Sequence, residues 1–333
     1  MRVTYLYYPT GNIFSRSARV SIYFYGRLQE LCDLTVFGPG TKYHWFKDNY
    51  NIYPYRDSMT LQDIVRETRA DVLLFGGARS IQAYNDFKTN VPNVLLLNEY
   101  FTLKPYLCNY VRKIGRFFDL SITRVRPNLQ DFDIPARWLP FSANDEEFYT
   151  EWSPDYLEKR QRKIIYRGTL RGQPPYDIRR KAIELLKGVG LLGPPASGRN
   201  YATRIWRYPR HLKRYVGGLS CAWSSWGETP LKTFEIMASG TCLLTQQFNR
   251  VVRRELFDNR EDLYVTYEDD CKDIIKKAEG ILYNIDKTKE ITKNALEVIN
   301  DRHLDKHRVK ELYEILKALV GGQEIPRRWR YEE

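Results

Sequence analysis

The chain has 333 residues, with 53 Lys and Arg against 41 Asp and Glu, which gives a net charge of +12. Its 25 Tyr, 15 Phe and 7 Trp provide ample apolar surface for burial, so the composition excludes a disordered chain, and the length suits two domains. No run approaches the ~18 consecutive apolar residues of a membrane-spanning helix, and the first residues are typical of a strand, so we expect a cytoplasmic protein without a transmembrane segment.

Strands and helices alternate along the first 140 residues. The sequence predicts strands over 3–8, 34–37, 71–75, 94–97 and 120–123, and helices over 15–31, 61–68 and 103–116. Such alternation is typical of βαβ units with a parallel sheet. Gly11 and Asn12 follow the first strand, and Glu99 follows the strand over 94–97, so they are predicted at the carboxyl ends of strands, where ligands of α/β sheets bind.

The pattern breaks near Trp138 and then resumes. We predict an amino-terminal domain over 1–142, a second domain over 143–302, and a closing helix with a basic tail over 303–333. The second domain is predicted to hold strands over 163–166, 219–223, 241–245 and 264–267, and helices over 176–187, 209–216, 229–239, 252–257 and 269–284. The closing helix is expected over 303–319, and the tail from Pro326 is expected to be frayed. The fold class is therefore α/β, with two Rossmann-like domains facing across a cleft.

The five cysteines are odd in number and form no C-x-x-C pair, which favours reduced thiols in a core over disulfides or a zinc site. They are Cys32, Cys108, Cys221, Cys242 and Cys271.

Most of the positive charge lies in one segment. Between Lys159 and Arg214 there are 16 basic and two acidic residues, so the rest of the chain is close to neutral. A local excess of this size faces an anion such as phosphate, nucleic acid or lipid headgroups, or else forms a solvated basic surface.

The segment from Ser224 to Thr245 contains the most informative candidate residues for binding a ligand. We predict a helix opened by Thr229 as N-cap and Pro230 at its first position, and such a helix amino terminus favours phosphate. Lys232 and Thr233 then lie in the first turn, and Glu235 lies one turn further on, where a carboxylate can accept hydrogen bonds from sugar hydroxyls. The alternative is a solvated Glu235 and a Lys232 that extends along the surface.

The run from Leu231 to Thr245, LKTFEIMASGTCLLT, resembles the donor-site signature of GT-B glycosyltransferases. It is most similar to the group 1 set that includes CgeB-like proteins, whose pattern is R-x-F-E-x-x-A-x-G-x-x-L. Residues 139–142, 165–168 and 307–309 resemble the linker, the first donor-domain strand and the closing helix of these proteins. The resemblance spans roughly residues 100–320. It implies a GT-B fold whose carboxyl-terminal helix closes back on the amino-terminal domain. It also implies a metal-independent enzyme that needs no cofactor besides its nucleotide-sugar donor, linked to UDP or GDP.

The resemblance also implies roles for individual residues. Glu235 would hold the nucleotide ribose, and Lys232 and Thr233 would lie near the diphosphate. Retaining members have a glutamate where this chain has Gly227, and arginine is usual at the position of Lys232, so the stereochemical outcome stays open. The predicted donor-site residues are Gly11, Asn12, Arg167, Gly168, Arg171, Gly227, Thr229, Lys232, Thr233 and Glu235, with Arg167, Gly168 and Arg171 stabilising the departing diphosphate.

His44 and Glu99 are the candidate bases for an inverting reaction. The acceptor stays open between a modified DNA base, as in phage-type DNA glycosylation, and a cell-surface glycan or lipid at an anionic membrane surface. A third alternative is a non-catalytic protein that binds phosphate or nucleic acid on a degenerate GT-B scaffold. DNA would be bound through Arg204, Arg207, Arg210, Lys213 and Arg214.

Overall fold

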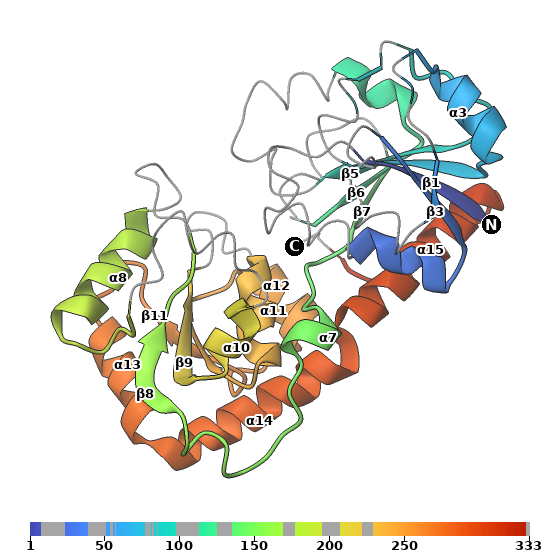
Figure 1. Ribbon diagram of the computed structural model, residues 1–333. Coiled ribbons are helices and arrows are strands. Elements are labelled where there is room, and N and C mark those ends of the chain that lie inside the picture. Colours follow the sequence, from blue (N-terminus) through green and yellow to red (C-terminus); the bar gives the residue numbers. More distant parts are fainter. Residues whose placement is uncertain are drawn as a thin grey trace. The chain divides into compact units, whose positions relative to one another are not determined.

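The computed structural model describes residues 1–7, 24–38, 51–53, 56, 58–76, 81, 83–84, 86–97, 113–124, 135–168, 177–194, 207–221 and 229–330. The chain divides into two compact units, which are described separately below (Figure 1). Unit 1 comprises Met1–Pro140 and Lys306–Tyr331, and unit 2 comprises Phe141–Asp305.

Unit 1 contains a parallel sheet in which the described strands follow the order β3-β2-β1-β4-β5-β6-β7. The strands are β1 (Arg2–Leu6), β2 (Asp33–Phe37), β3 (Asn51–Ile52), β4 (Val72–Phe75), β5 (Asn93–Leu97), β6 (Leu120–Thr123) and β7 (Ala136–Trp138). β4, β5 and β6 are buried along their whole length, as expected for a parallel sheet covered on both faces.

The helices of unit 1 cover the two faces of this sheet. Those in the described part of the unit include η1 (Arg27–Glu30), α3 (Leu61–Thr68), η3 (Gly115–Phe117) and α15 (Asp305–Val320). α3 packs Leu61, Ile64 and Val65 into one core, whereas α15 packs Leu312 and Leu316 into the core on the other face. The expected closing helix therefore does return to the amino-terminal unit.

The carboxyl-terminal tail is ordered as far as the structure describes it, so the expectation of a frayed tail was wrong for these residues. Arg137 donates from Nη2 to the carbonyl oxygen of Ile325 at 2.8 Å. The indole of Trp329 donates to Glu311 Oε2 at 2.8 Å and stacks under the guanidinium of Arg308 at 4.5 Å. These contacts pin the tail against unit 1, because a buried indole needs both an apolar surface and an acceptor.

Unit 2 contains a second parallel sheet, in the order β11-β10-β9-β8. Its strands are β8 (Gln161–Ile165), β9 (Tyr215–Ser220), β10 (Cys242–Gln246) and β11 (Val265–Tyr267). Its helices are α7 (Asp145–Phe148), α8 (Asp177–Gly188), α10 (Arg207–Leu212), α11 (Leu231–Ala238), α12 (Arg250–Phe257), α13 (Ile274–Tyr283) and α14 (Ile285–Arg302). α8 and α13 pack on one face of the sheet, while α11 and α14 pack against each other on the opposite side (Figure 1).

Glycine in the middle of β9 lets α11 approach the sheet closely. A Cβ at Gly218 would lie 2.8 Å from Cγ2 of Ile236 on α11, so a larger residue would push the helix away.

The longest helix of unit 2, α14, was not predicted. Asn284 ends α13 and also caps α14, where its side chain accepts from the amide of Lys287 at 3.3 Å, so no break in the sequence separates the two helices. The buried face of α14 includes Thr288 and Thr292, which weakens its apolar periodicity. The short elements β3, β7 and α7 were missed as well. The helix predicted over 209–216 was wrong at its end, because Tyr215 already begins β9.

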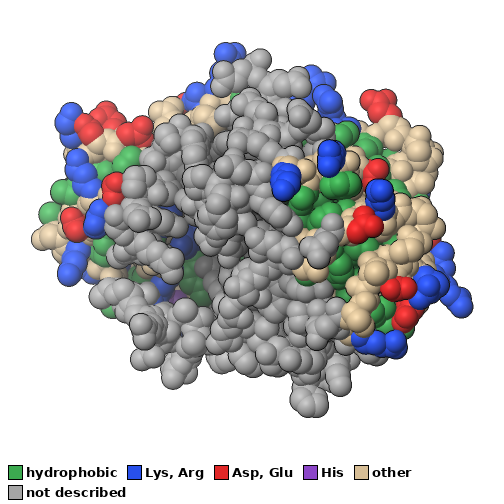
Figure 2. All heavy atoms as spheres, turned by 90° about the horizontal axis from the view of Figure 1, so that it is seen from above, with side chains coloured by type: hydrophobic (Ala, Val, Ile, Leu, Met, Phe, Trp, Pro, Cys, Tyr) green, Lys and Arg blue, Asp and Glu red, His purple; other side chains and the backbone are tan. Residues whose placement is uncertain are grey.

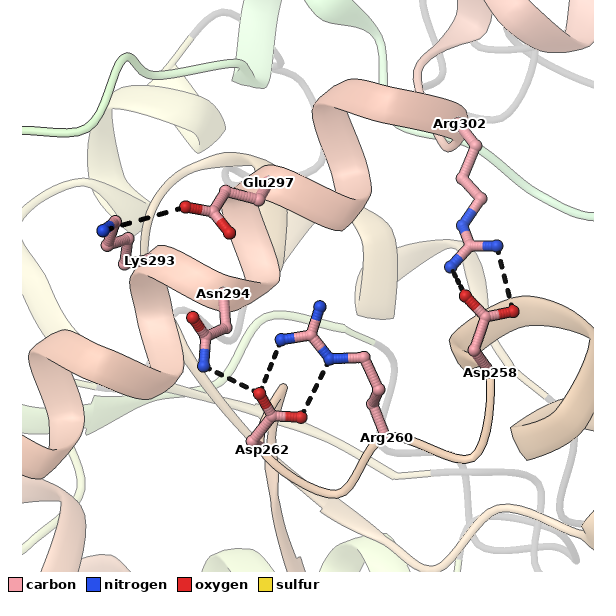
Figure 3. Close-up of polar contacts among 7 residues, drawn as sticks. All are labelled: Asp258, Arg260, Asp262, Lys293, Asn294, Glu297 and Arg302. Carbon is pink, nitrogen blue, oxygen red and sulfur yellow. Dashed lines mark hydrogen bonds and ion pairs between the residues drawn. The ribbon is translucent and has the colours of Figure 1, made fainter.

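Polar contacts fix α14 over the connection between α12 and β11 (Figure 3). Asp258 has a left-handed backbone (φ 51°) and forms an ion pair with Arg302 at the end of α14. Asn294 donates to Asp262 Oδ2 at 2.7 Å, and Arg260 donates to the other carboxylate oxygen of Asp262 at 3.0 Å.

The two ends of unit 2 are joined to each other. The amide of Ala143 donates to the carbonyl of His303 at 2.9 Å, and the amide of Asp305 donates to the carbonyl of Ala143 at 2.8 Å. The hydroxyl of Ser142 donates to Asp305 Oδ1 at 2.6 Å. The chain therefore enters and leaves unit 2 at one place.

Three of the four described cysteines, Cys221, Cys242 and Cys271, are buried, as predicted for small apolar side chains of a core. Among the residues described, no helix has both the length and the apolar character needed to cross a bilayer.

Candidate functional site

The helix α11 organises the candidate site at its amino end. It begins at Leu231, and Pro230 is its N-cap, with φ −70° and ψ 155°. The predicted cap at Thr229 was therefore wrong by one residue, because the extended ψ of Pro230 places that proline outside the helix. No described side chain caps this end, which leaves the positive end of the helix dipole directed at whatever lies there.

Thr233 anchors the start of α11 to the sheet. Its side chain is fully buried, and its hydroxyl lies 3.2 Å from the hydroxyl of Ser220, the last residue of β9. The first turn of the helix is thus held at the carboxyl end of a central strand.

Glu235 lies one turn further along and is 1% exposed. The alternative of a solvated helix residue is excluded by this burial. A carboxylate is removed from water in proteins only where polar partners replace the water, so Glu235 is placed as a buried acceptor behind the amino end of α11.

Lys232 does not extend into solvent along the helix. Its Nζ lies 5.3 Å from the ring centroid of Tyr166, which follows β8, and it contacts Gly168 so closely that a Cβ there would overlap it. The ammonium group of α11 is therefore brought to the carboxyl end of β8.

A second cation reaches the same place from a different helix. Arg179 lies in the first turn of α8, is 6% exposed, and has its guanidinium carbon 5.8 Å from the ring of Tyr166. Sequence reasoning counted Arg179 only as part of the basic segment. It lies three residues before Ala182, on the face that α8 buries, so helical periodicity could have placed it inward.

Cys221, directly after β9, is a thiol whose pKa is affected by both cations, Arg179 and Lys232. Burial raises the pKa of this thiol, while the charges of Arg179 and Lys232 both lower that pKa. Arg179 and Lys232, which belong to two different helices, thus both lie near the ends of β8 and β9.

Arg167 is buried between β8 and α10. Its Nη2 contacts Nε2 of His211, and since a guanidinium can only donate, His211 accepts there. Burial, together with the charges of Arg167 and Arg214, lowers the pKa of His211 to about 4. His211 is therefore neutral at physiological pH and holds Arg167 as an acceptor.

The remaining predicted residues are distributed as follows. Arg207 begins α10, Arg210 and Arg214 are exposed, and Lys213 is half-buried with its Nζ donating to the carbonyl of Tyr149 at 3.1 Å. Those that fall outside the described residues are Gly11, Asn12, His44, Glu99, Arg171, Gly227 and Arg204.

The basic segment is only partly a surface feature. Arg167 and Arg179 are buried, and Arg160 is partly buried. On the face seen in Figure 2, the Lys and Arg side chains of the described residues are interspersed with Asp and Glu and do not form one continuous patch. Within the same residues, no group of three or more His, Cys, Asp or Glu side chains could hold a metal ion.

Residues 179–314 match the family model described as "Glycosyl transferase-like". This match includes the signature from Leu231 to Thr245 and confirms the resemblance to group 1 glycosyltransferases. The expected enzyme class, a glycosyltransferase, is confirmed with it. No curated protein matches the chain in sequence.

Solved structures extend the likeness over nearly the whole chain. HepE from Anabaena, solved in complex with UDP and glucose, is 11% identical, with a TM-score of 0.66 over 96% of this chain and 100% of that one. A glycosyltransferase from Rickettsia africae is 12% identical, with a TM-score of 0.64 over 96% and 98%. An alpha-glucosyltransferase, solved with UDP-glucose and DNA containing an abasic site, is 10% identical, with a TM-score of 0.65 over 95% and 99%. At these identities the likeness concerns the fold, and it confirms the predicted GT-B class.

Proposed function

We propose that this chain, which carries a glycosyltransferase domain on a GT-B fold, transfers a sugar from a UDP-linked donor to a hydroxyl acceptor. The observation that carries the proposal is the convergence of Lys232 and Arg179 with the uncapped amino end of α11 at the carboxyl ends of β8 and β9. A diphosphate is the natural occupant of such a place, because helix amino ends and fixed cations both favour phosphate. HepE and the alpha-glucosyltransferase were both solved with UDP or UDP-glucose, which supports UDP as the leaving group here.

The chemistry follows from the charge that develops during transfer. The acceptor oxygen bonds to the anomeric carbon as the bond from that carbon to the phosphate oxygen breaks, and UDP leaves with an added negative charge. Lys232, Arg179 and Arg167 are held in place before the reaction, so they stabilise this charge without reorganising. We propose that these cations act without a metal ion.

Glu235 is suited to the ribose of the donor. Its carboxylate has two acceptor oxygens, which match the two neighbouring hydroxyls of a ribose, and it lies one helical turn behind the phosphate end of α11. The acceptor proton would go to His44 or Glu99, the candidate bases predicted in the amino-terminal half.

We further propose an anionic acceptor, namely DNA. One structural relative was solved with DNA, and Arg210 and Arg214 of this chain are exposed near α10. Phosphate contacts of this kind would bring a duplex to the enzyme in a salt-dependent way.

The donor proposal is tested by thermal unfolding in a panel of nucleotide sugars, since a bound ligand raises the melting temperature, followed by hydrolysis of the sugar nucleotide that binds. We expect a UDP-sugar to stabilise the chain and to be hydrolysed, with hydrolysis lost in Glu235→Ala. If a GDP-sugar is preferred, the proposed identity of the donor as a UDP-sugar is rejected, but the proposed donor site is not. Binding without hydrolysis would favour the non-catalytic alternative, and a panel with neither binding nor turnover would reject the donor site.

The acceptor proposal is tested separately, by binding to a duplex that contains hydroxymethylated bases at increasing salt. We expect the affinity to fall steeply with salt and to disappear when Arg204, Arg207 and Arg210 are replaced by Glu. Equal binding by wild type and the reversed variant would reject these arginines as the DNA contact, and no binding to the duplex would reject DNA. Binding only to anionic vesicles would assign the acceptor to a membrane surface.

A further inference from the structure

The carboxyl end of α11 is held by one guanidinium. Arg160, the residue before β8, donates from Nη2 to the carbonyl of Ser239 at 3.0 Å and from Nη1 to the carbonyl of Gly240 at 2.8 Å. These carbonyls lie in the turn that ends the helix, where the backbone lacks its own donors. A cation here also opposes the negative end of the helix dipole.

The same guanidinium reaches two strands. Its Nη1 donates to Thr241 Oγ1 at 2.9 Å and to the carbonyl of Tyr215, at the start of β9, at 3.3 Å. Among the described residues Arg160 forms no ion pair, and all of these acceptors are neutral oxygens. Burial lowers the pKa of Arg160 to about 10, which leaves it charged at neutral pH.

Tyr156 completes the arrangement. Its hydroxyl donates to the carbonyl of Gly240 at 2.9 Å, and its ring lies 4.4 Å from the guanidinium carbon of Arg160. Gly240 has a left-handed backbone (φ 61°), and a Cβ at this position would overlap the Tyr156 hydroxyl. Gly240, the glycine of the LKTFEIMASGTCLLT signature, therefore leaves the space in which Tyr156 and Arg160 reach its carbonyl oxygen.

We propose that Arg160, supported by Tyr156, is a positioning residue of the donor site. It fixes α11 at its carboxyl end so that Lys232 and Glu235 keep their places near the other end. The inference rests on the proposed donor site. α11 has eight residues and a length of about 12 Å, too short to be stable alone, so its placement depends on its buried face and on the contacts at its two ends.

The two anchors of α11 act differently on an incoming anion. Thr233 binds Ser220 through neutral hydroxyls, whereas Arg160 places a positive charge at the negative end of the helix. Loss of this charge would weaken the positive potential at the amino end as well as loosen the helix.

The test compares Arg160→Met and Arg160→Lys with Arg162→Met, a matched control two residues away whose side chain is exposed. Calorimetry gives the UDP dissociation constant at a temperature where the unfolding curve shows each variant folded. We expect UDP binding to weaken about tenfold in Arg160→Met, less in Arg160→Lys, and less than twofold in the control. A lower melting temperature in Arg160→Met with an unchanged dissociation constant would overturn the inference.

A milder variant keeps the test valid if Arg160→Met does not fold. Tyr156→Phe removes only the hydrogen bond to Gly240, and we expect it to weaken UDP binding about threefold. Gly240→Ala should weaken UDP binding more than Tyr156→Phe does. The double variant should bind UDP better than the product of the two single effects predicts, because the hydroxyl that the new Cβ at position 240 would meet is absent in Tyr156→Phe. Independent effects of the two changes would contradict the proposed contact.

Failure of the donor site and failure of the positioning role can be told apart. If wild type binds neither UDP nor GDP, the proposed function fails, and hydrogen exchange of the α11 amides then decides the role of Arg160 without a ligand. Faster exchange in α11 but not in α13 of Arg160→Met, relative to Arg162→Met, supports the role, and unchanged exchange in α11 overturns it.

Discussion

The two ends of α11 differ in how their backbone groups are satisfied. At the carboxyl end, Arg160 and Tyr156 bind the carbonyls of Ser239 and Gly240. At the amino end no described side chain caps the helix, although Lys232 is directed to the end of β8. One end is closed by protein groups, and the other is the end at which we propose that the donor diphosphate binds.

This contrast shows how a short helix can serve as a binding element. Stability comes from the closed end and from the buried face, so the open end can keep an unfavourable concentration of positive charge. Variants at the open end should therefore affect ligand binding more than stability, and the following predictions use that expectation.

Glu235→Gln should have the largest effect. The amide keeps the shape of the buried side chain but replaces one acceptor with a donor, so we expect turnover of the UDP-sugar to fall by about a hundredfold or more. Hydrolysis assays measure this, with the exposed Glu279→Gln on α13 as control. Wild-type turnover in Glu235→Gln would remove the residue from the site.

Lys232→Met should weaken UDP binding by about tenfold to a hundredfold, because a charge-assisted contact to the diphosphate is lost. The melting temperature without ligand should stay unchanged or rise, since one of several nearby positive charges is gone. Calorimetry with Lys276→Met, an exposed lysine on α13, as control checks the result. If Lys232→Met lowered the stability strongly but bound UDP normally, Lys232 would be a stabilising residue of α11 and not a ligand-binding one.

Gly168→Ala should have a smaller effect on the same lysine. The added methyl would overlap Nζ of Lys232 and lie 2.5 Å from the Tyr166 hydroxyl, so the flexible lysine must move. We expect about a threefold to tenfold loss of UDP affinity, together with a lower melting temperature, because Gly168 has φ 157°, a backbone conformation that alanine rarely adopts. In the Lys232→Met background the alanine should weaken binding less than it does in wild type, and a full additive loss there would contradict the contact with Lys232.

His211→Gln should change the pH dependence of stability only slightly. Burial, and then the charges of Arg167 and Arg214, lower the pKa of His211 from its ordinary value of 6.5 to about 4 in the folded chain. The unfolded chain thus binds a proton that the folded chain does not, so this histidine makes wild type less stable as the pH falls from 6.5 toward 4. We expect the melting temperature of His211→Gln to fall less over this range, by about 2–4 °C. Equal slopes in wild type and variant would contradict a buried, neutral His211.

The sequence predicted most strands of both sheets, but it placed β9 (Tyr215–Ser220) too late in the chain, over 219–223. The helix Leu61–Thr68 and the strand Leu120–Thr123 lie where they were predicted. The helix start is marked by Thr60 and Asp63, whose side chains cap it reciprocally. α14 was missed because its buried face mixes Thr288 with apolar residues, and tertiary packing determines such a helix more than periodicity does.

The candidate site was predicted in part. The resemblance identified Lys232 and Glu235, but the sequence alone did not show that Glu235 is buried or that Lys232 is directed to Tyr166. Arg160 and Arg179 were missed as individuals, since a basic residue in a charged segment is ordinarily solvated and only the packing shows which ones turn inward.

The return of α15 to unit 1 has a consequence for the order of folding. Residues 309–316 supply Val309, Leu312, Ile315 and Leu316 to a core that also contains Val3 and Tyr5. During synthesis on a ribosome these residues emerge after the whole of unit 2. The amino-terminal half therefore cannot complete this core until α15 has been synthesised, while the later half can finish its own core first.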